Sequence, residues 1–194
     1  STLWLPGCDH AGMATPEKLD QETLSQGLDP NGPEFEEFSS KYKTSLSAEI
    51  IDQLKRTGAS CDWSRFRYTM DEDYTTSIYK AFDICSEKQL LYKDSDDHWY
   101  LDMTDAANRL LDEIYNNNIE IIPESGRNTL IHYLKNIQPW CISRDIRWGH
   151  KMPNDDRYVL DTWFSSSLWV FATLGWGNDN ADDFDKFFPA DMLE

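Results

Sequence analysis

The clearest hydrophobic pattern in the chain lies between residues 35 and 54. Apolar residues recur there every three or four positions, a spacing that places them on one face of a helix. Gly58 follows this run, and glycine is typical of the position just past a helix. The pattern therefore predicts a long amphipathic helix that ends before Gly58. Its expected inner face is Phe35, Phe38, Tyr42, Leu46, Ile50 and Leu54.

Shorter patterns predict further helices downstream. Thr69 and Glu72 have the spacing of a capping box, which predicts a helix start. Residues 104–116 and 125–136 have helical spacing, and residues 165–173 suit a helix that ends before Gly175. The inward-facing residues expected in the first two of these helices are Tyr74, Ile78, Phe82 and Cys85, followed by Ala107, Leu110, Leu111 and Ile114.

Short apolar runs between polar or turn residues predict strands. They cover residues 3–7, 119–122, 140–143 and 158–163, while residues 27–33 read as a loop. Residues 94–97 and 154–156 are polar joints, either turns or places where a longer segment was lost. Strands that alternate with helices favour an α/β layered fold. A length of 194 residues suits one domain, so we expect a single domain over residues 1–194.

Charge and cysteine usage narrow the class of protein. The net charge is −17, from 18 basic and 35 acidic residues, which argues against a broad nucleic-acid-binding surface. Solubility is the simplest interpretation of this acidity, and an acidic partner-binding surface is the alternative. The spacing of Cys8, Cys61, Cys85 and Cys141 predicts free thiols in a reducing compartment and no bound metal. No apolar run is long enough to span a membrane, and no signal peptide is visible.

Asp9 is the first candidate for binding chemistry. It follows a turn after the opening apolar run, and ligands bind at the carboxyl ends of strands in open α/β sheets. A carboxylate there can pair with an ammonium group through charge-assisted hydrogen bonds. The alternative is that Asp9 caps the next helix.

Five blocks of sequence, in this order, resemble valyl-tRNA synthetases. The resemblance extends from Leu3 to about Pro189, although that family usually has Thr where Cys8 stands. The blocks are residues 3–15 (LWLPGCDHAGMAT), 58–65 with 68–71 (GASCDWSR, YTMD), 98–103 (HWYLDM), 136–144 with 148–153 (NIQPWCISR, WGHKMP), and 159–166 with 168–169 and 173–176 (VLDTWFSS, LW, TLGW).

The resemblance implies a helix-rich, partial Rossmann-like class I synthetase catalytic fold with parallel strands flanked by helices. It implies recognition of valine for activation with ATP and Mg, followed by transfer to tRNA(Val) in the cytoplasm. Because the chain is acidic, we expect most tRNA contacts outside it. No catalytic side chain is expected, since adenylate formation depends on positioning and charge stabilisation. The implied valine-binding residues are Asp9, Trp140, Trp163 and Val159, with further ligand contacts from His10, Gly12 and Asp161.

Several parts of the family pattern are missing from these 194 residues. Neither the HIGH-type nor the KMSKS-type signature that cradles ATP is present. The family's editing domain would be inserted near residues 94–97, and a longer stretch is usual near residues 154–157. We therefore expect this segment alone to be inactive, as a fragment or a minimised relative of valine–tRNA ligase. The alternative is a catalytically inactive, synthetase-like binding or interaction module.

Overall fold

The computed structural model describes residues 3–12, 14–30, 32, 35–177 and 182–190. The chain divides into two compact units, and unit 1 comprises Ser1–Lys80 and Arg144–Glu194. Unit 2 comprises Ala81–Ser143. The single domain expected over residues 1–194 stays a prediction. No helix within the described ranges combines the length and the apolar character that a membrane crossing requires.

Unit 1 holds the parallel strand pair of the structure. In it, β1 pairs in parallel with β2, with Gly7 opposite Arg67 and Cys8 opposite Tyr68. A second, three-stranded sheet has the order β6-β8-β7. The elements that lie in or reach unit 1 are β1 (Gly7–Cys8), α1 (Ala14–Ser25), α2 (Phe35–Arg56), the 3₁₀ helix Trp63–Arg65, β2 (Arg67–Tyr68), α3 (Glu72–Glu87), β6 (Ser143–Arg144), β7 (Lys151–Met152), β8 (Asp155–Leu160), α6 (Thr162–Ser166), α7 (Trp169–Ala172) and α8 (Asp182–Phe187).

The opening apolar run is not a strand, and that prediction is wrong. Residues 3–5 have no strand structure, and Trp4 is 56% exposed. Pairing begins where the partner strand is available, since the Arg67 N–H donates to the Pro6 carbonyl at 3.1 Å. The strand is therefore β1, at the end of the predicted run, directly before Asp9.

The long helix predicted from the apolar spacing is confirmed as α2. Its inner face is only partly buried: Phe35, Phe38 and Ile50 are half-buried, Leu54 is exposed, and the Leu46 side chain lies outside the described part. Gly58 has a φ of +86°, the left-handed conformation expected after a helix. The described part of residues 27–33 is a loop, as predicted.

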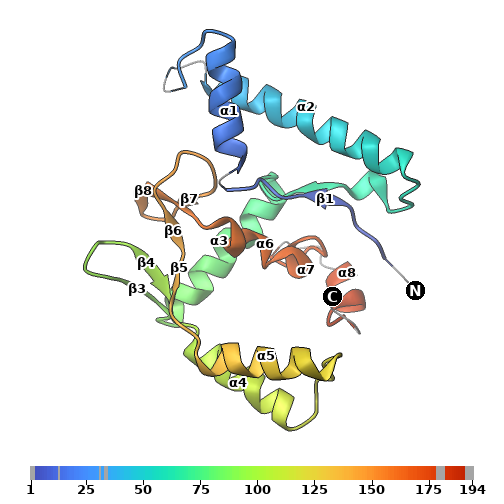
Figure 1. The fold of residues 1–194 in the computed structure, drawn as a ribbon, viewed down its shortest axis with the longest axis vertical. Helices are drawn as coiled ribbons and strands as arrows, with labels where there is room; N and C mark the ends of the chain where they lie inside the picture. The colour runs from blue at the N-terminus through green and yellow to red at the C-terminus, as the bar shows by residue number, and fades with distance from the viewer. Residues whose placement is uncertain (1–2, 13, 31, 33–34, 178–181, 191–194) are drawn as a thin grey trace. The chain divides into compact units, whose positions relative to one another are not determined.

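Helix α1 packs against α2 (Figure 1), and both are anchored to the loop before β7. The Arg147 guanidinium donates to Asp20 at 2.7 and 3.0 Å and to the Pro30 carbonyl. It also lies over the Phe35 ring, 4.8 Å from its centroid. One side chain thus connects α1, the following loop and the start of α2 to a segment more than a hundred residues away.

Helix α3 confirms the predicted face but not the predicted cap. Tyr74, Ile78 and Phe82 are buried, and Cys85 is half-buried. The helix begins at Glu72 itself, whereas a capping box needs its Glu three residues after the cap. The Thr69 hydroxyl instead pairs with His10, so the capping-box prediction is wrong.

Several strands and helices of the second half are divided or shifted relative to the prediction. Instead of one strand over residues 140–143, the structure has two two-residue strands, β5 and β6, over residues 140–144. Strand β8 ends at Leu160, because Asp161 caps α6 through its side chain. The helix predicted for residues 165–173 is divided into α6 and α7, and Gly175 follows with a φ of +90°.

Unit 2 combines a three-stranded antiparallel sheet, in the order β3-β4-β5, with the helical hairpin of α4 and α5 (Figure 1). The two predicted helices are confirmed, and Ala107, Leu111 and Ile114 are buried. Residues 119–122 form no strand; Ile119 is 40% and Ile122 80% exposed, so that prediction is wrong. The elements are β3 (Leu91–Lys93), β4 (Trp99–Leu101), α4 (Thr104–Tyr115), α5 (Glu124–Lys135) and β5 (Trp140–Cys141).

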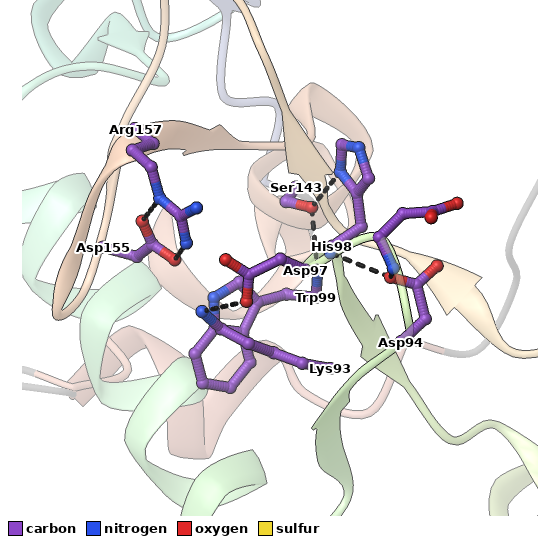
Figure 2. Close-up of polar contacts among 9 residues, drawn as sticks. Lys93, Asp94, Asp97, His98, Trp99, Ser143, Asp155 and Arg157 are labelled. Atoms are coloured by element: carbon purple, nitrogen blue, oxygen red, sulfur yellow. Dashed lines mark hydrogen bonds and ion pairs between the residues drawn. The ribbon is translucent and has the colours of Figure 1, made fainter.

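The polar joint at residues 94–97 is a tight turn between β3 and β4 (Figure 2). Asp94 Oδ1 accepts the Asp96 N–H at 3.0 Å and the His98 N–H at 2.9 Å. Lys93 pairs with Asp97 across the turn at 2.9 Å. The two strands are thus joined directly by a turn whose backbone N–H groups are satisfied by its own aspartate.

The start of β4, directly after this turn, is held by Ser143 within unit 2. Ser143 Oγ accepts the Trp99 N–H at 3.0 Å and lies 3.1 Å from His98 Nδ1 (Figure 2). In unit 1, a turn at residues 153–154 joins β7 and β8, so of the predicted joint at 154–156 only Asn154 lies in a turn and residues 155–156 begin β8. Asn154 has a φ of +62° there, and Arg157 makes two 2.9 Å hydrogen bonds to the buried Asp155 carboxylate (Figure 2).

Candidate functional site

Asp9 directly follows β1, and both of its carboxylate oxygens accept hydrogen bonds. Oδ1 accepts the Ala11 N–H at 2.7 Å, which closes a turn of the kind that Asp side chains commonly form. Ala11 has a φ of +49°, an uncommon conformation for a residue with a side chain. Oδ2 accepts from the Ser166 hydroxyl of α6. Asp9 is nevertheless exposed, so its carboxylate is accessible to a ligand.

A cavity of about 230 Å³ lies beside Asp9. This is smaller than the ~300–1,000 Å³ typical of sites for drug-sized ligands, and it suits a ligand the size of an amino acid. The cavity has one anionic group, two hydroxyls and an apolar side provided by an indole and a thiol. Its lining residues are Gly7, Cys8, Asp9, Thr69, Ser166 and Trp169.

Gly7 allows the indole of Trp169 to reach the cavity. A Cβ at position 7 would lie 1.8 Å from Trp169 Cη2 and 2.6 Å from the Arg67 carbonyl oxygen. Only glycine permits β1 to pair with β2 while Trp169 packs flush on the backbone. The Trp169 ring in turn contacts Tyr74, with ring centroids 5.8 Å apart.

The residues around the cavity perturb one another electrostatically. Burial, and after it the nearby Asp9 carboxylate, raises the pKa of the Cys8 thiol. The same two causes, in the same order, raise the pKa of Tyr68 and of Tyr74. Tyr74 also donates its hydroxyl to the Ser165 carbonyl at 2.8 Å. These phenols and the thiol stay neutral around neutral pH, which leaves Asp9 as the charged group of the cavity.

His10 is buried beneath the segment that carries Asp9. Its N–H donates to Thr69 Oγ1 at 2.9 Å, and its Nδ1 lies 2.7 Å from the same oxygen. Its carbonyl accepts the indole N–H of Trp148 at 2.7 Å. The imidazole meets the His150 ring edge-on at 5.1 Å. With a 1% exposed side chain, His10 fixes the backbone that presents Asp9; the ligand contact expected of it stays a prediction.

Gly12 brings the same segment against α6. A Cβ there would lie 2.1 Å from Thr162 Oγ1, so the close approach requires glycine. Trp163 follows Thr162, and its ring is 74% exposed. Trp163 is therefore not a core residue. In the sequence it stands between Thr162, which lies against Gly12, and Ser166, which donates to Asp9. It remains a predicted valine contact.

Asp161 and Val159 are buried in the structure. Asp161 Oδ1 accepts the Trp163 N–H at 3.1 Å, and Oδ2 pairs with the Arg144 guanidinium. Both oxygens thus already have structural roles. Val159 is fully buried, and a Cβ at Gly149 would lie 3.2 Å from its Cγ2. Neither residue lines the cavity beside Asp9, and their ligand contacts stay predictions.

Trp140 belongs to unit 2, where β5 pairs antiparallel with β4 and Trp140 stands opposite Leu101. Its contribution to a valine site stays a prediction. The cavity also contains residues that the sequence did not single out as ligand contacts: Cys8, Thr69, Ser166 and Trp169. Ser166 and Trp169 follow Trp163 by three and six residues, and this helical spacing was the available signal. Within the described ranges, no three His, Cys, Asp or Glu side chains gather as a metal site.

Comparison with known proteins identifies the family. The sequence model of the class I tRNA synthetases (I, L, M and V) matches residues 1–97, 94–155 and 154–194. The chain belongs to this family of aminoacyl-tRNA ligases. The resemblance seen in the five sequence blocks is thereby confirmed at the level of the class I synthetases.

Curated class I relatives include several valine–tRNA ligases. The enzyme of Petrotoga mobilis is 30% identical over 174 residues, which cover 74% of this chain and 18% of the relative. That of Zymomonas mobilis is 38% identical over 125 residues, covering 50% of this chain and 14% of the relative. The chloroplastic/mitochondrial valine–tRNA ligase 2 of Arabidopsis thaliana is 36% identical over 132 residues, with the same coverage. The chain thus spans less than a fifth of the length of these relatives.

Solved structures support the class I fold. The Mycobacterium tuberculosis methionyl-tRNA synthetase bound by methionyl-adenylate matches with a TM-score of 0.76 and 18% identity, over 98% of this chain and 43% of that one. A second complex of the same enzyme gives 0.77 at 17% identity, over 97% and 42%. The predicted synthetase-like fold is therefore confirmed. The predicted parallel strands are confirmed only in part: within the described residues β1 and β2 pair in parallel, while β3-β4-β5 and β7-β8 are antiparallel.

Proposed function

We propose that this chain is the part of a valine–tRNA ligase that recognises valine before ATP-dependent activation and transfer to tRNA(Val). The observation that carries the proposal is the exposed Asp9 carboxylate on a cavity of amino-acid size. The identities of 30–38% to valine–tRNA ligases support valine as the amino acid.

The cavity offers complementary chemistry for the two ends of valine. The Asp9 carboxylate would bind the α-ammonium group through charge-assisted hydrogen bonds, which are about twice as strong as neutral ones. The Trp169 indole and the Cys8 thiol give an apolar wall for a branched side chain. We further propose Trp163, Trp140 and Val159 as contacts of the valine side chain in the complete enzyme.

ATP with Mg and tRNA(Val) are substrates that we propose for the complete protein. Formation of the adenylate joins the valine carboxylate to the α-phosphorus of ATP, and it needs positioning more than a side-chain base. Accordingly, no residue of this chain is assigned a proton-transfer role. With a net charge of −17, the chain is unsuited to broad phosphate contacts, so we place most of the tRNA interface elsewhere in the protein.

We also propose that longer segments occur in the family near residues 94–97 and 154–157, where this structure has tight turns between β3 and β4 and between β7 and β8. The family match is divided into three stretches that meet at residues 94–97 and 154–155. The β3-β4 turn is short and internally hydrogen-bonded, which supports a direct connection without an inserted editing domain.

Titration of the 194-residue chain with L-valine, by calorimetry or NMR, tests the proposal. We expect weak binding by the wild type and none by Asp9→Ala. Asp83→Ala is the matched control, since Asp83 is an exposed carboxylate on α3 away from the cavity lining, and it should bind valine as the wild type does. Equal binding by wild type and Asp9→Ala would remove the assignment of Asp9.

The choice of amino acid is tested separately, by amino-acid-dependent pyrophosphate exchange with the full-length protein. Exchange with valine is expected. Exchange with isoleucine or leucine but not valine would overturn the substrate, while valine binding without any exchange would favour a binding module over a ligase.

A further inference from the structure

We propose that Ser166 is the positioning residue that orients the Asp9 carboxylate for the ammonium group of the amino acid. This inference rests on the proposed function and extends it to a residue 157 positions away in the sequence. Asp9 is exposed and directly follows the two-residue strand β1, so packing alone does not fix its side chain. Two hydrogen bonds do so: the Ala11 N–H on Oδ1 and the Ser166 hydroxyl on Oδ2.

The hydroxyl proton of Ser166 has two acceptors within reach. Its Oγ lies 2.8 Å from the Thr162 carbonyl, one turn back in α6, and also contacts Asp9 Oδ2. A serine hydroxyl has one proton, so it donates to one of them at a time. The Ser165 hydroxyl also donates to the Thr162 carbonyl, at 2.8 Å. Because that carbonyl already has a hydroxyl donor, it does not depend on Ser166, and the Ser166 proton is available to Asp9.

This arrangement suits a carboxylate that must receive a cationic ligand. In the empty cavity Ser166 holds Oδ2 in place. When an ammonium group approaches Oδ2, the hydroxyl can either remain on the second lone pair or turn to the Thr162 carbonyl. Neither outcome leaves a buried polar group without a partner, so ligand entry does not carry the desolvation penalty of an unsatisfied group.

The neighbouring serines show that the role is specific to one position. Ser165 is fully buried and bonds within its own helix. Ser167 is exposed and donates to the Phe164 carbonyl at 2.9 Å. Of these three consecutive serines, Ser166 is the one that donates to Asp9, and it also lines the cavity.

The test measures L-valine affinity in four variants of the 194-residue chain. Ser166→Ala and Ser166→Val lack the hydroxyl. Ser166→Thr retains the hydroxyl on a side chain of the same shape as that of the Ser166→Val variant. Ser167→Ala is the matched control. We expect Ser166→Ala and Ser166→Val to bind valine at least about tenfold more weakly, the lower end of the loss expected for one hydrogen bond to a charged group. Ser166→Thr and Ser167→Ala should bind within about twofold of the wild type on the same scale. Thermal unfolding of each variant shows whether the fold is retained.

The outcomes separate this inference from the proposed function. Wild-type-like affinity in Ser166→Ala, or an equal loss in the isosteric Thr and Val variants, would overturn the role of the hydroxyl while Asp9 binding stands. Should Ser166→Ala fail to fold, the valine affinities of Ser166→Thr and Ser166→Val still show whether the hydroxyl is needed. No valine binding by the folded wild type would overturn both proposals together.

Discussion

Replacement of Gly7 by alanine tests the packing on which the cavity depends. The added methyl group would lie 1.8 Å from Trp169 Cη2 and 2.6 Å from the Arg67 carbonyl oxygen. Carbon atoms in contact are about 3.5–4.0 Å apart, so the indole would have to move by about 1.7 Å or more. The Arg67 carbonyl cannot move independently, because its strand is paired with β1.

The expected cost of Gly7→Ala follows from these two contacts. Overpacking of a well-packed site costs typically ~1–3 kcal/mol. Since one contact is with backbone, we expect the upper end, about 3 kcal/mol of the free energy of unfolding. Movement of Trp169 would also deform the cavity, so valine binding should fall even in the folded variant.

Urea denaturation followed by circular dichroism measures this loss, and Gly126→Ala is the matched control. A Cβ at Gly126 would meet its nearest neighbours at 3.8 Å, an ordinary contact. Gly126 lies in helix α5, where alanine is favoured over glycine by about 1 kcal/mol, so the control should be stabilised. If Gly7→Ala unfolds within about 0.5 kcal/mol of the wild type, the range of neutral surface changes, and still binds valine, the packing argument is refuted.

Two further substitutions address the support of the site. Tyr74→Phe removes the hydrogen bond to the Ser165 carbonyl and should cost about 1 kcal/mol at neutral pH. Burial raises the pKa of Tyr74 above its ordinary value of 10.0. The contribution of Tyr74 to the free energy of unfolding is therefore complete below pH 10 and is lost at higher pH. Urea midpoints measured from pH 7 to 11 should accordingly fall less steeply in Tyr74→Phe than in the wild type. Asp161→Ala removes the cap on the Trp163 N–H and the partner of Arg144, and should cost about 1–2 kcal/mol, whereas Asp161→Asn keeps a capping oxygen and should lose less in the same measurement. An Asp161→Ala variant as stable as the wild type would contradict the capping role.

The helices α2, α3, α4 and α5 were predictable from the sequence because their signals are local, whereas α1 was not predicted. Helix α2 begins at Phe35, where its apolar spacing starts, and α5 lies within one residue of its predicted bounds. The two- and three-residue strands were not predictable to their bounds, since they are defined by partners far away in the sequence, whereas the six-residue β8 overlaps the strand predicted at residues 158–163. An apolar run such as residues 119–122 reads as a strand, yet no described strand pairs with it.

The candidate site was predictable in part for the same reason. Asp9 and Gly12 could be selected because they stand in one contiguous block, and the structure places both against α6. Ser166 and Trp169 could not be linked to Asp9 by any local pattern, since only the folded chain brings them to the same cavity. Asp161 shows the converse: a conspicuous carboxylate in a family block whose two oxygens serve the fold.

The anchoring of the Asp9 segment has a consequence for the order of folding. Its hydrogen-bond partners Thr69, Trp148 and Ser166 lie 59, 138 and 157 residues further along the chain. Long-range pairings of this kind close large loops, and they form late relative to local helices. The cavity beside Asp9 can therefore not form until the stretch containing Ser166 has been synthesised, 157 residues after Asp9.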